Sequence, residues 1–192
     1  MSAGDGGRVI AGTARGIRLD APGPGTRPLA DRVKEALFAI LEPDLRGAVV
    51  ADLFAGSGAA GIEALSRGAA RATFVERDRA AAAVIAENLA RTHLGGERAR
   101  IVRAEAVGWL AGPEAATAGP FDIVIADPPY AESGLLVAAL EAVGPRLAAG
   151  GRVVAKHFWR DAPPPRIGLL ASERERRFGE TMLTFYRRAE VR

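Results

Sequence analysis

Five short apolar runs alternate with segments of helical length, and this alternation constrains the fold more than any other feature of the sequence. The apolar runs predict strands at 48–53, 72–76, 99–103, 121–126 and 152–156. The segments between them predict helices at roughly 59–67, 79–93, 105–111 and 133–147. Alternation of this length favours a parallel sheet that is covered by helices on both faces.

The C-terminal part of the chain follows a different pattern. Beyond three prolines at 163–165, two longer strand candidates at 167–176 and 181–187 are separated by Gly179 and Glu180. This predicts an antiparallel hairpin at the edge of the sheet. We therefore expect an α/β fold with a mostly parallel, seven-stranded sheet and an antiparallel C-terminal edge. Within it, Asp78 should cap the second helix, and Gly150 and Gly151 should end the last one.

The N-terminal part predicts a small appendage. Two strand-like runs at 8–12 and 16–19 predict a β-hairpin, and a loop rich in proline and glycine follows them. A helical pattern over 29–41 comes next, and we expect Pro43 to end it. These features divide the chain into an N-terminal hairpin and linker, residues 1–26, and a main domain, residues 27–192.

Composition excludes several classes of protein. The chain has no cysteine, which excludes disulfides and thiolate metal sites, and with two histidines we expect no metal site. No apolar run has the length of a membrane span and the first residues contain no signal-peptide core, so we expect a cytoplasmic protein. The net charge of +3 leans weakly towards an acidic partner, and arginine supplies nearly all of the positive charge.

A glycine loop follows the first strand of the alternating region. Residues 49–61 read as strand, loop and helix start, and their glycines satisfy G-x-G-x-x-G, with Glu76 placed 20 residues after Gly56. A nicotinamide dinucleotide is one interpretation. Three features count against it: Asp52 lies where a pyrophosphate would bind, Phe54 and Ala55 lengthen the turn, and no residues suggest hydride transfer.

S-adenosylmethionine, which has a cationic amino acid end and a ribose, fits the loop better. Asp52 would face its ammonium group, the glycines would allow close approach of the backbone, and Glu76 would accept hydrogen bonds from the ribose hydroxyls. Glu105 and Ala106 would meet the adenine edge. The full set of expected cofactor residues is Asp52, Phe54, Ala55, Gly56, Ser57, Gly58, Glu76, Arg77, Glu105, Ala106 and Asp127.

The stretch Asp127-Pro128-Pro129-Tyr130 follows the apolar run at 121–126. Two prolines end the strand and stiffen the chain, at the carboxyl end where open α/β sheets bind their ligands. A carboxylate, free carbonyl groups and an aromatic ring then lie together. Such a group of residues can accept hydrogen bonds from an exocyclic amine while the ring stacks on the base, so we assign these four residues to the catalytic site.

These motifs together resemble the RsmD family. The resemblance rests on 52–58, on 61–68 (Gly-Ile-Glu-Ala-Leu-Ser-Arg-Gly), on 127–130 and on N-terminal segments around Arg8–Gly12 and Arg27–Glu35. It implies a Rossmann-like class I S-adenosylmethionine-dependent methyltransferase fold over 27–192. It also implies methylation of a guanine N2 in small-subunit (16S) ribosomal RNA. The chain departs from the family pattern at Leu29 and Ala30, where hydroxyl residues are usual, at Glu105, and in the stretch 156–160.

The resemblance leads to a mechanism and to a list of RNA contacts. Asp127 and the Pro128 carbonyl would accept the two amine hydrogens, and Tyr130 would stack on a base that has left its helix. We expect a monomer acting on a partly assembled small subunit. Rival interpretations are a DNA adenine methyltransferase, a protein glutamine methyltransferase and a non-catalytic RNA-binding module. The expected phosphate contacts are Arg8, Arg15, Arg18, Arg27 and Arg32.

Overall fold

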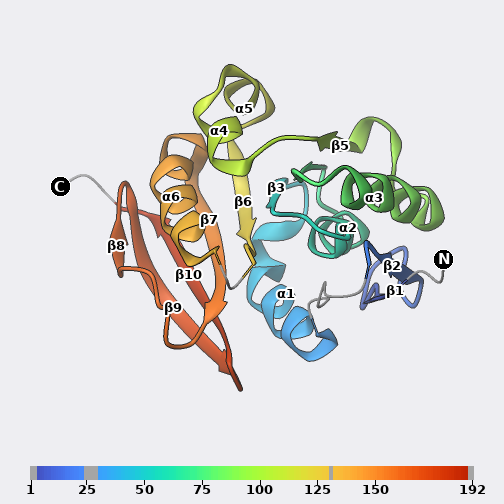
Figure 1. The fold of residues 1–192 in the computed structure, drawn as a ribbon, viewed down its shortest axis with the longest axis horizontal. Helices are drawn as coiled ribbons and strands as arrows, with labels where there is room; N and C mark the ends of the chain where they lie inside the picture. Colours follow the sequence, from blue (N-terminus) through green and yellow to red (C-terminus); the bar gives the residue numbers. More distant parts are fainter. Residues whose placement is uncertain (1–3, 24–29, 130–131, 190–192) are drawn as a thin grey trace.

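A computed structural model describes residues 4–23, 30–129 and 132–189 of the chain. In these residues, one sheet has eight strands in the order β5-β4-β3-β6-β7-β10-β9-β8, and β1 and β2 form a second, two-stranded sheet (Figure 1). The strands are β1 (Gly4–Arg8), β2 (Arg18–Ala21), β3 (Val49–Leu53), β4 (Arg71–Val75), β5 (Ala99–Val102), β6 (Phe121–Ala126), β7 (Leu147–Phe158), β8 (Arg166–Ile167), β9 (Leu170–Phe178) and β10 (Thr181–Arg188). The helices are α1 (Asp31–Leu45), α2 (Ala59–Ser66), α3 (Arg79–Thr92), α4 (Ala106–Ala111), α5 (Pro113–Ala118) and α6 (Ser133–Val143), with 3-10 turns η1 (Gly96–Arg98) and η3 (Gly144–Arg146).

The direction of the strands confirms the predicted sheet. The five strands β5, β4, β3, β6 and β7 are parallel, and β10 runs antiparallel between β7 and β9. The two-residue strand β8, which pairs antiparallel with β9, makes the described sheet eight-stranded rather than seven-stranded.

Both faces of the central strands are buried, which explains their continuous apolar runs. In β6, Ile123 and Ile125 face one hydrophobic cluster, and Val124 and Ala126 face the other. The first cluster contains side chains of α1, α2 and α3, and the second contains side chains of α4, α5 and α6. The sheet is therefore the middle layer of three (Figure 1).

A buried carboxylate attaches the N-terminal segment to this body. Glu63 on α2 is fully buried, and its two oxygens accept the backbone N–H groups of Ile10 and Ala11 at 2.7 and 3.0 Å. Arg67 donates to the same carboxylate at 2.7 Å. On the other side, the buried ammonium group of Lys34 donates to the Arg8 carbonyl. The segment thus docks through charge-assisted hydrogen bonds.

This docking corrects the predicted hairpin. The ladder strands are β1 and β2, four to five residues long, rather than 8–12 and 16–19. Between them, the chain leaves the ladder because Glu63 takes the N–H groups of Ile10 and Ala11, and the N–H of Thr13 donates to the Ser66 carbonyl at 2.9 Å. Gly12 is required here, since a Cβ would lie 1.9 Å from the Ser66 oxygen.

Two predicted helix ends are also wrong. α1 continues through Pro43 to Leu45, because Leu41 and Leu45 are both buried one turn apart, and this burial outweighs the one i→i−4 hydrogen bond that Pro43 cannot make. The last helix, α6, ends at Val143 rather than near 147, and Gly150 and Gly151 lie inside β7, where the pairing with β6 is irregular. The short helix α5 was not expected. Asp78 does cap α3, accepting the Ala81 N–H at 2.8 Å.

The boundary at residue 26 falls among residues 24–29, which lie outside the described part of the chain. On the N-terminal side of this boundary, Val9, Ala14 and Leu19 are buried in the same hydrophobic cluster as side chains of α1, α2 and α3. The division into residues 1–26 and 27–192 therefore stays a prediction, and the N-terminal segment shares its core with the main body.

We predict that Glu63→Ala lowers the free energy of unfolding by about 3–5 kcal/mol, because it leaves the Arg67 guanidinium and the N–H groups of Ile10 and Ala11 without their acceptor. The matched control is Glu42→Ala. Glu42 pairs with the same Arg67 at 2.9 Å, but its side chain is 60% exposed, so its loss should cost at most about 1 kcal/mol. Urea denaturation of the three proteins measures both values. Equal losses in the two variants would contradict the proposed attachment.

Candidate active site

A cleft of about 610 Å³ opens at the carboxyl ends of the parallel strands. Residues that follow β3, β4, β5 and β6 line it, together with Lys156 of β7. The chain order reverses here, because β4 and β5 lie on one side of β3 and β6 and β7 lie on the other. Such a switch point is where open α/β sheets bind ligands.

The glycine loop after β3 has an unusual backbone. Phe54, Gly56 and Gly58 have positive φ angles of 60°, 55° and 75°, a conformation that glycine adopts without strain and phenylalanine rarely does. Gly61, one turn into α2, packs so closely on the sheet that a Cβ would lie 2.3 Å from the ring of Phe74. The loop is thus shaped to bring backbone close to a ligand.

Asp52 ends β3 beneath this loop. It is 2% exposed and lines the cleft, and its Oδ2 accepts the N–H of Gly61 at 2.8 Å. Burial raises the pKa of Asp52 to about 8, partly offset by the Gly61 hydrogen bond, with further raising by the charges of Asp127 and Glu76. A cationic ligand group placed nearby would stabilise its ionised form.

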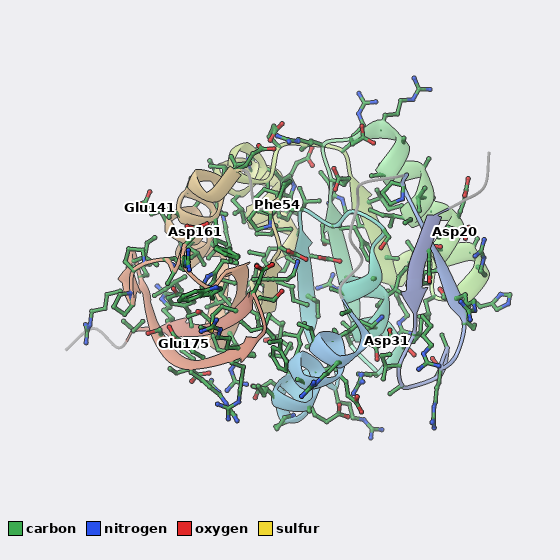
Figure 2. The ribbon with its side chains drawn as sticks, turned by 60° about the horizontal axis from the view of Figure 1, so that its bottom comes forward. Asp20, Asp31, Phe54, Glu141, Asp161 and Glu175 are labelled. Atoms are coloured by element: carbon green, nitrogen blue, oxygen red, sulfur yellow. The ribbon has the colours of Figure 1, made fainter. Side chains whose placement is uncertain are left out.

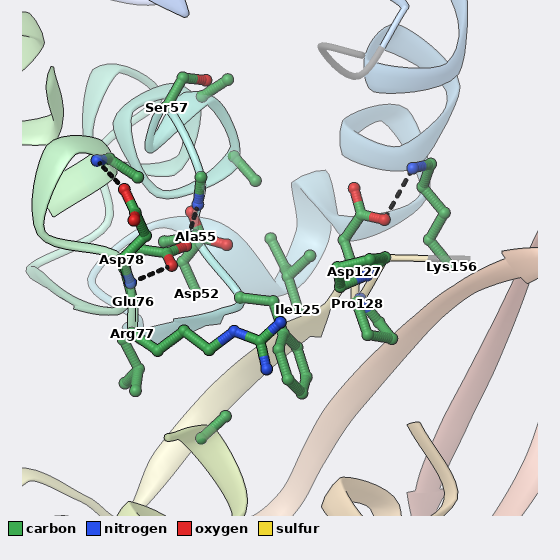
Figure 3. Close-up of a pocket in the computed structure, with 18 of the residues that line it drawn as sticks. Asp52, Ala55, Ser57, Glu76, Arg77, Asp78, Ile125, Asp127, Pro128 and Lys156 are labelled. Atoms are coloured by element: carbon green, nitrogen blue, oxygen red, sulfur yellow. Dashed lines mark hydrogen bonds and ion pairs between the residues drawn. The ribbon is translucent and has the colours of Figure 1, made fainter. Parts of the chain in front are cut away.

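Glu76 follows β4 on the neighbouring side of the cleft, as Figure 3 shows. One carboxylate oxygen accepts the N–H of Gly56 at 2.8 Å, and the other accepts the N–H of Asp78 at 2.8 Å. The expected contact of Glu76 with ribose stays a prediction. The structure adds that Glu76 ties the glycine loop to the start of α3.

Arg77 links three elements at the rim of the cleft. Its guanidinium donates to both oxygens of Glu132, at 2.5 and 3.1 Å, and lies 3.6 Å from Glu105. These acidic groups raise the pKa of Arg77, Glu132 most of all. The pairing connects the segment after β4 with the segment that follows Asp127-Pro128-Pro129. Glu132 was not expected from the sequence, because it is distant from Arg77 along the chain.

Asp127 follows β6 and lies next to the cation of Lys156. The Nζ of Lys156 lies 2.6 Å from Oδ1 of Asp127 (Figure 3). Burial raises the pKa of Asp127, and the charge and hydrogen bond of Lys156 act against that rise. Pro128 is buried and Pro129 exposed, and both line the cleft. Tyr130 lies outside the described residues.

The cleft carries far more negative than positive charge. Among the described residues, its lining includes the five carboxyl groups of Asp52, Glu76, Asp78, Glu105 and Asp127, but only the two cations of Arg77 and Lys156. The arrangement therefore favours a cationic ligand over a pyrophosphate. The described residues contain no group of three or more His, Asp or Glu side chains arranged to hold a metal ion.

The structure brings most of the predicted site residues together. All of the predicted cofactor residues except Gly58 line the one cleft, and Gly58 begins α2 at its back. Sequence reasoning missed Lys156, which depends on strand register, and Asn88. The buried Asn88 amide donates to the carbonyls of Asp20 and Ser57, both at 2.9 Å, and so ties the N-terminal segment to the glycine loop. An asparagine on the inner face of a predicted helix is the signal that could have found it.

The predicted phosphate contacts lie away from the cleft. Arg15, Arg18 and Arg32 are exposed, and Arg8 forms an ion pair with Asp31 at 2.9 Å while its side chain stays 61% exposed. Figure 2 places Asp31 at the start of α1 and Asp20 on the N-terminal hairpin. None of these four arginines lines the cleft, and Arg27 lies outside the described residues.

The comparisons with known proteins identify the family. A family model described as "Conserved hypothetical protein 95" matches residues 7–187. A Bacillus subtilis protein named "Putative rRNA methyltransferase YlbH" is 36% identical over 94% of this chain and 98% of its own length. Escherichia coli "Ribosomal RNA small subunit methyltransferase D" is 46% identical over 67% of this chain. The chain belongs to the RsmD family.

A solved structure supports the fold of this RsmD-family chain. A "Putative methyltransferase yhhF from Escherichia coli" superposes with a TM-score of 0.81 at 37% identity, covering 94% of this chain and 97% of that one. The predicted Rossmann-like methyltransferase fold is confirmed. The sequence match spans 62% of the length of the E. coli small-subunit methyltransferase D. Within the described residues, each helix is too short or too polar to cross a bilayer.

We predict that Asp52 makes the ligand-free RsmD-family chain less stable as pH rises. A carboxyl group with a pKa near 8 in the folded state, against about 3.9 when unfolded, favours folding while protonated, and this contribution is lost as pH rises towards 8. The unfolding free energy of Asp52→Asn minus that of wild type should therefore increase from pH 5 to about pH 8. Thermal unfolding across this range tests it, with exposed Asp161→Asn as the flat control. A pH-independent gap would refute the assignment.

Proposed function

We propose that the chain transfers a methyl group from S-adenosyl-L-methionine to the exocyclic N2 amine of a guanine in small-subunit ribosomal RNA. The observation that carries the proposal is the cleft, in which the glycine loop and Asp127-Pro128-Pro129 face one anionic space. One side of this space suits a cation with a ribose, and the other suits an amine. The names of the two sequence relatives, a small-subunit ribosomal RNA methyltransferase and a putative rRNA methyltransferase, support methylation of ribosomal RNA.

The residues present fit the cofactor. Its cationic groups suit a lining with five carboxylates, whereas a dinucleotide would bring a pyrophosphate against Asp52. Asp52 would hold the ammonium end, the glycine loop would lie along the amino acid part, and Glu76 would accept from the ribose. Glu105 and Ala106 would border the adenine. When bound, S-adenosyl-L-methionine supplies an electrophilic methyl group on a sulfonium.

On the acceptor side, the chain must orient a weak nucleophile, because the guanine amine shares its lone pair with the ring. Asp127 and the carbonyl of Pro128 accept the two amine hydrogens and turn the lone pair towards the methyl group. The rigid Pro128-Pro129 turn holds this geometry, so most of the acceleration comes from positioning. Transfer would form the N–C bond as the S–C bond of the sulfonium breaks, and Asp127 would pass the released amine proton to water.

The target base must leave its helix to enter the cleft, which favours a loop of RNA. Arg8, Arg15, Arg18, Arg27 and Arg32 are the proposed phosphate contacts. We propose a partly assembled small ribosomal subunit as substrate, because the N-terminal segment is a small surface for recognising a long RNA alone. We propose that the chain acts as a monomer.

The cofactor assignment predicts that Glu76→Ala weakens binding of S-adenosylhomocysteine about tenfold or more. It removes an acceptor for ribose and the charged partner of the Gly56 N–H, and hydrogen bonds to charged groups contribute about 1.5–3 kcal/mol. Isothermal titration calorimetry measures the change. Glu87→Ala, which removes the same charge from the exposed surface of α3, should bind like wild type. Unchanged affinity in Glu76→Ala would remove Glu76 from the site.

The reaction itself predicts labelled N2-methylguanine in small subunits that lack the modification. Naked ribosomal RNA, duplex DNA and bulk protein are the competing substrates in the same assay. Asp127→Ala should lower the transfer rate about a hundredfold or more, because the amine loses its acceptor. Asp161→Ala, an exposed aspartate outside the cleft lining, should stay active. Label in DNA or protein would replace the proposed substrate, and no transfer to any of them would refute it.

A further inference from the structure

Lys156 occupies a position that a site for a cationic cofactor should avoid. It lies on β7 with its side chain 15% exposed, and it lines the same cleft as Asp52 and Glu76. The parallel strands β6 and β7 pair Ala126 with Ala155, so the residues that come next, Asp127 and Lys156, lie side by side. A partly buried cation here repels a sulfonium unless another interaction compensates for this repulsion.

The side chains around the Lys156–Asp127 ion pair show which interaction compensates for the repulsion between Lys156 and a sulfonium. In the same cleft lining, Asp52 of β3 and Glu76, which follows β4, are both acidic, and the charges of Asp127 and Glu76 both raise the pKa of Asp52. On the other side, Leu183 of β10 and Leu37 of α1 give it an apolar wall. Among the described residues, Lys156 is the one cation in ion-pair contact with Asp127.

The next positive charge on this face of the sheet lies outside the cleft. Leu183 pairs with Lys156 on one side and with Arg176 of β9 on the other, so the three side chains share a face of the sheet. Arg176 is exposed and is not part of the cleft lining. Arg176 is therefore a matched control for Lys156: it is a cation on the same face of the sheet, two strands away and outside the cleft.

We propose that Lys156 is the positioning residue of the methyl-acceptor site: it keeps Asp127 ionised and engages one carboxylate oxygen, so that the carboxylate acts as a pure acceptor for the target amine. This role rests on the proposed function. Protonation of Asp127 would replace one of its acceptor sites with an O–H donor, so the carboxyl group would hold the donor amine less firmly. Lys156 is thus present for the carboxylate, at the cost of some repulsion towards the cofactor.

This role of Lys156 is electrostatic. Burial favours the neutral form of Asp127 and so raises its pKa, and Lys156 is the group that opposes this rise. Removing the cation while keeping the length of the side chain should therefore leave Asp127 protonated over more of the neutral range. Lys156→Met makes this change, and Lys156→Arg retains the charge.

The test is the pH dependence of single-turnover methyl transfer to small subunits that lack the modification. In Lys156→Met, the acidic limb of the rate profile should move up by about one pH unit or more. This lowers the rate about tenfold at a pH below the limb, and the rate should recover at higher pH. Lys156→Arg and the matched control Arg176→Met should keep the wild-type limb. S-adenosylhomocysteine should bind Lys156→Met at least as tightly as wild type, which a misfolded variant would not do.

A second measurement is independent of the substrate. Carbon-13 NMR titration of the aspartate carboxyl groups, with Asp127 assigned by comparison with Asp127→Asn, should show its midpoint moving up in Lys156→Met but not in Arg176→Met. An unmoved midpoint, or an acidic limb equal to that of wild type, would overturn the role given to Lys156. Absence of transfer by the wild-type chain would refute the proposed function, and the NMR titration would still decide whether Lys156 sets the charge on Asp127.

Discussion

The buried carboxylate of Asp52 beneath α2 is the constraint on which the candidate site depends. Its hydrogen bond from Gly61 fixes the first turn of α2 over the end of β3. To reach that position, the chain turns sharply after the strand, with Phe54 held at a positive φ. The turn leaves the edge of the sheet open, and β6 places Asp127 across the opening. The cleft is therefore a consequence of how one strand connects to one helix.

Electrostatics explain why such a costly arrangement persists. Asp52 is buried and Asp127 is partly buried, and both have raised pKa values. Ionising Asp52 beside the charges of Asp127 and Glu76 costs free energy in the ligand-free protein, as is common at functional sites. A cationic ligand relieves the repulsion at Asp52, while Lys156 relieves it at Asp127 without any ligand. Under the proposed function the two carboxylates would have different partners: Asp52 would face the cofactor, and Asp127, paired with Lys156, would face the acceptor amine.

The sequence predicted those parts of the structure that depend on local patterns. Central strands that are buried on both faces appear in the sequence as uninterrupted apolar runs. The glycine loop can be recognised because close approach of the backbone needs glycine at fixed spacing. Contacts that depend on register or docking were not predictable. Lys156 meets Asp127 only because β6 and β7 pair in one register, and the hairpin strands shift because Glu63 on a distant helix takes two backbone N–H groups.

The same docking fixes the N-terminal segment in relation to the cleft. An isolated two-stranded hairpin is marginally stable, so the segment depends on the bonds it makes with the body. Glu63 holds one part of it, while Asn88 joins Asp20 to the Ser57 carbonyl in the glycine loop. Arginines on this segment are therefore carried at a set position relative to the loop. An RNA held by them would meet the acceptor site in a geometry determined by packing rather than by a flexible linker.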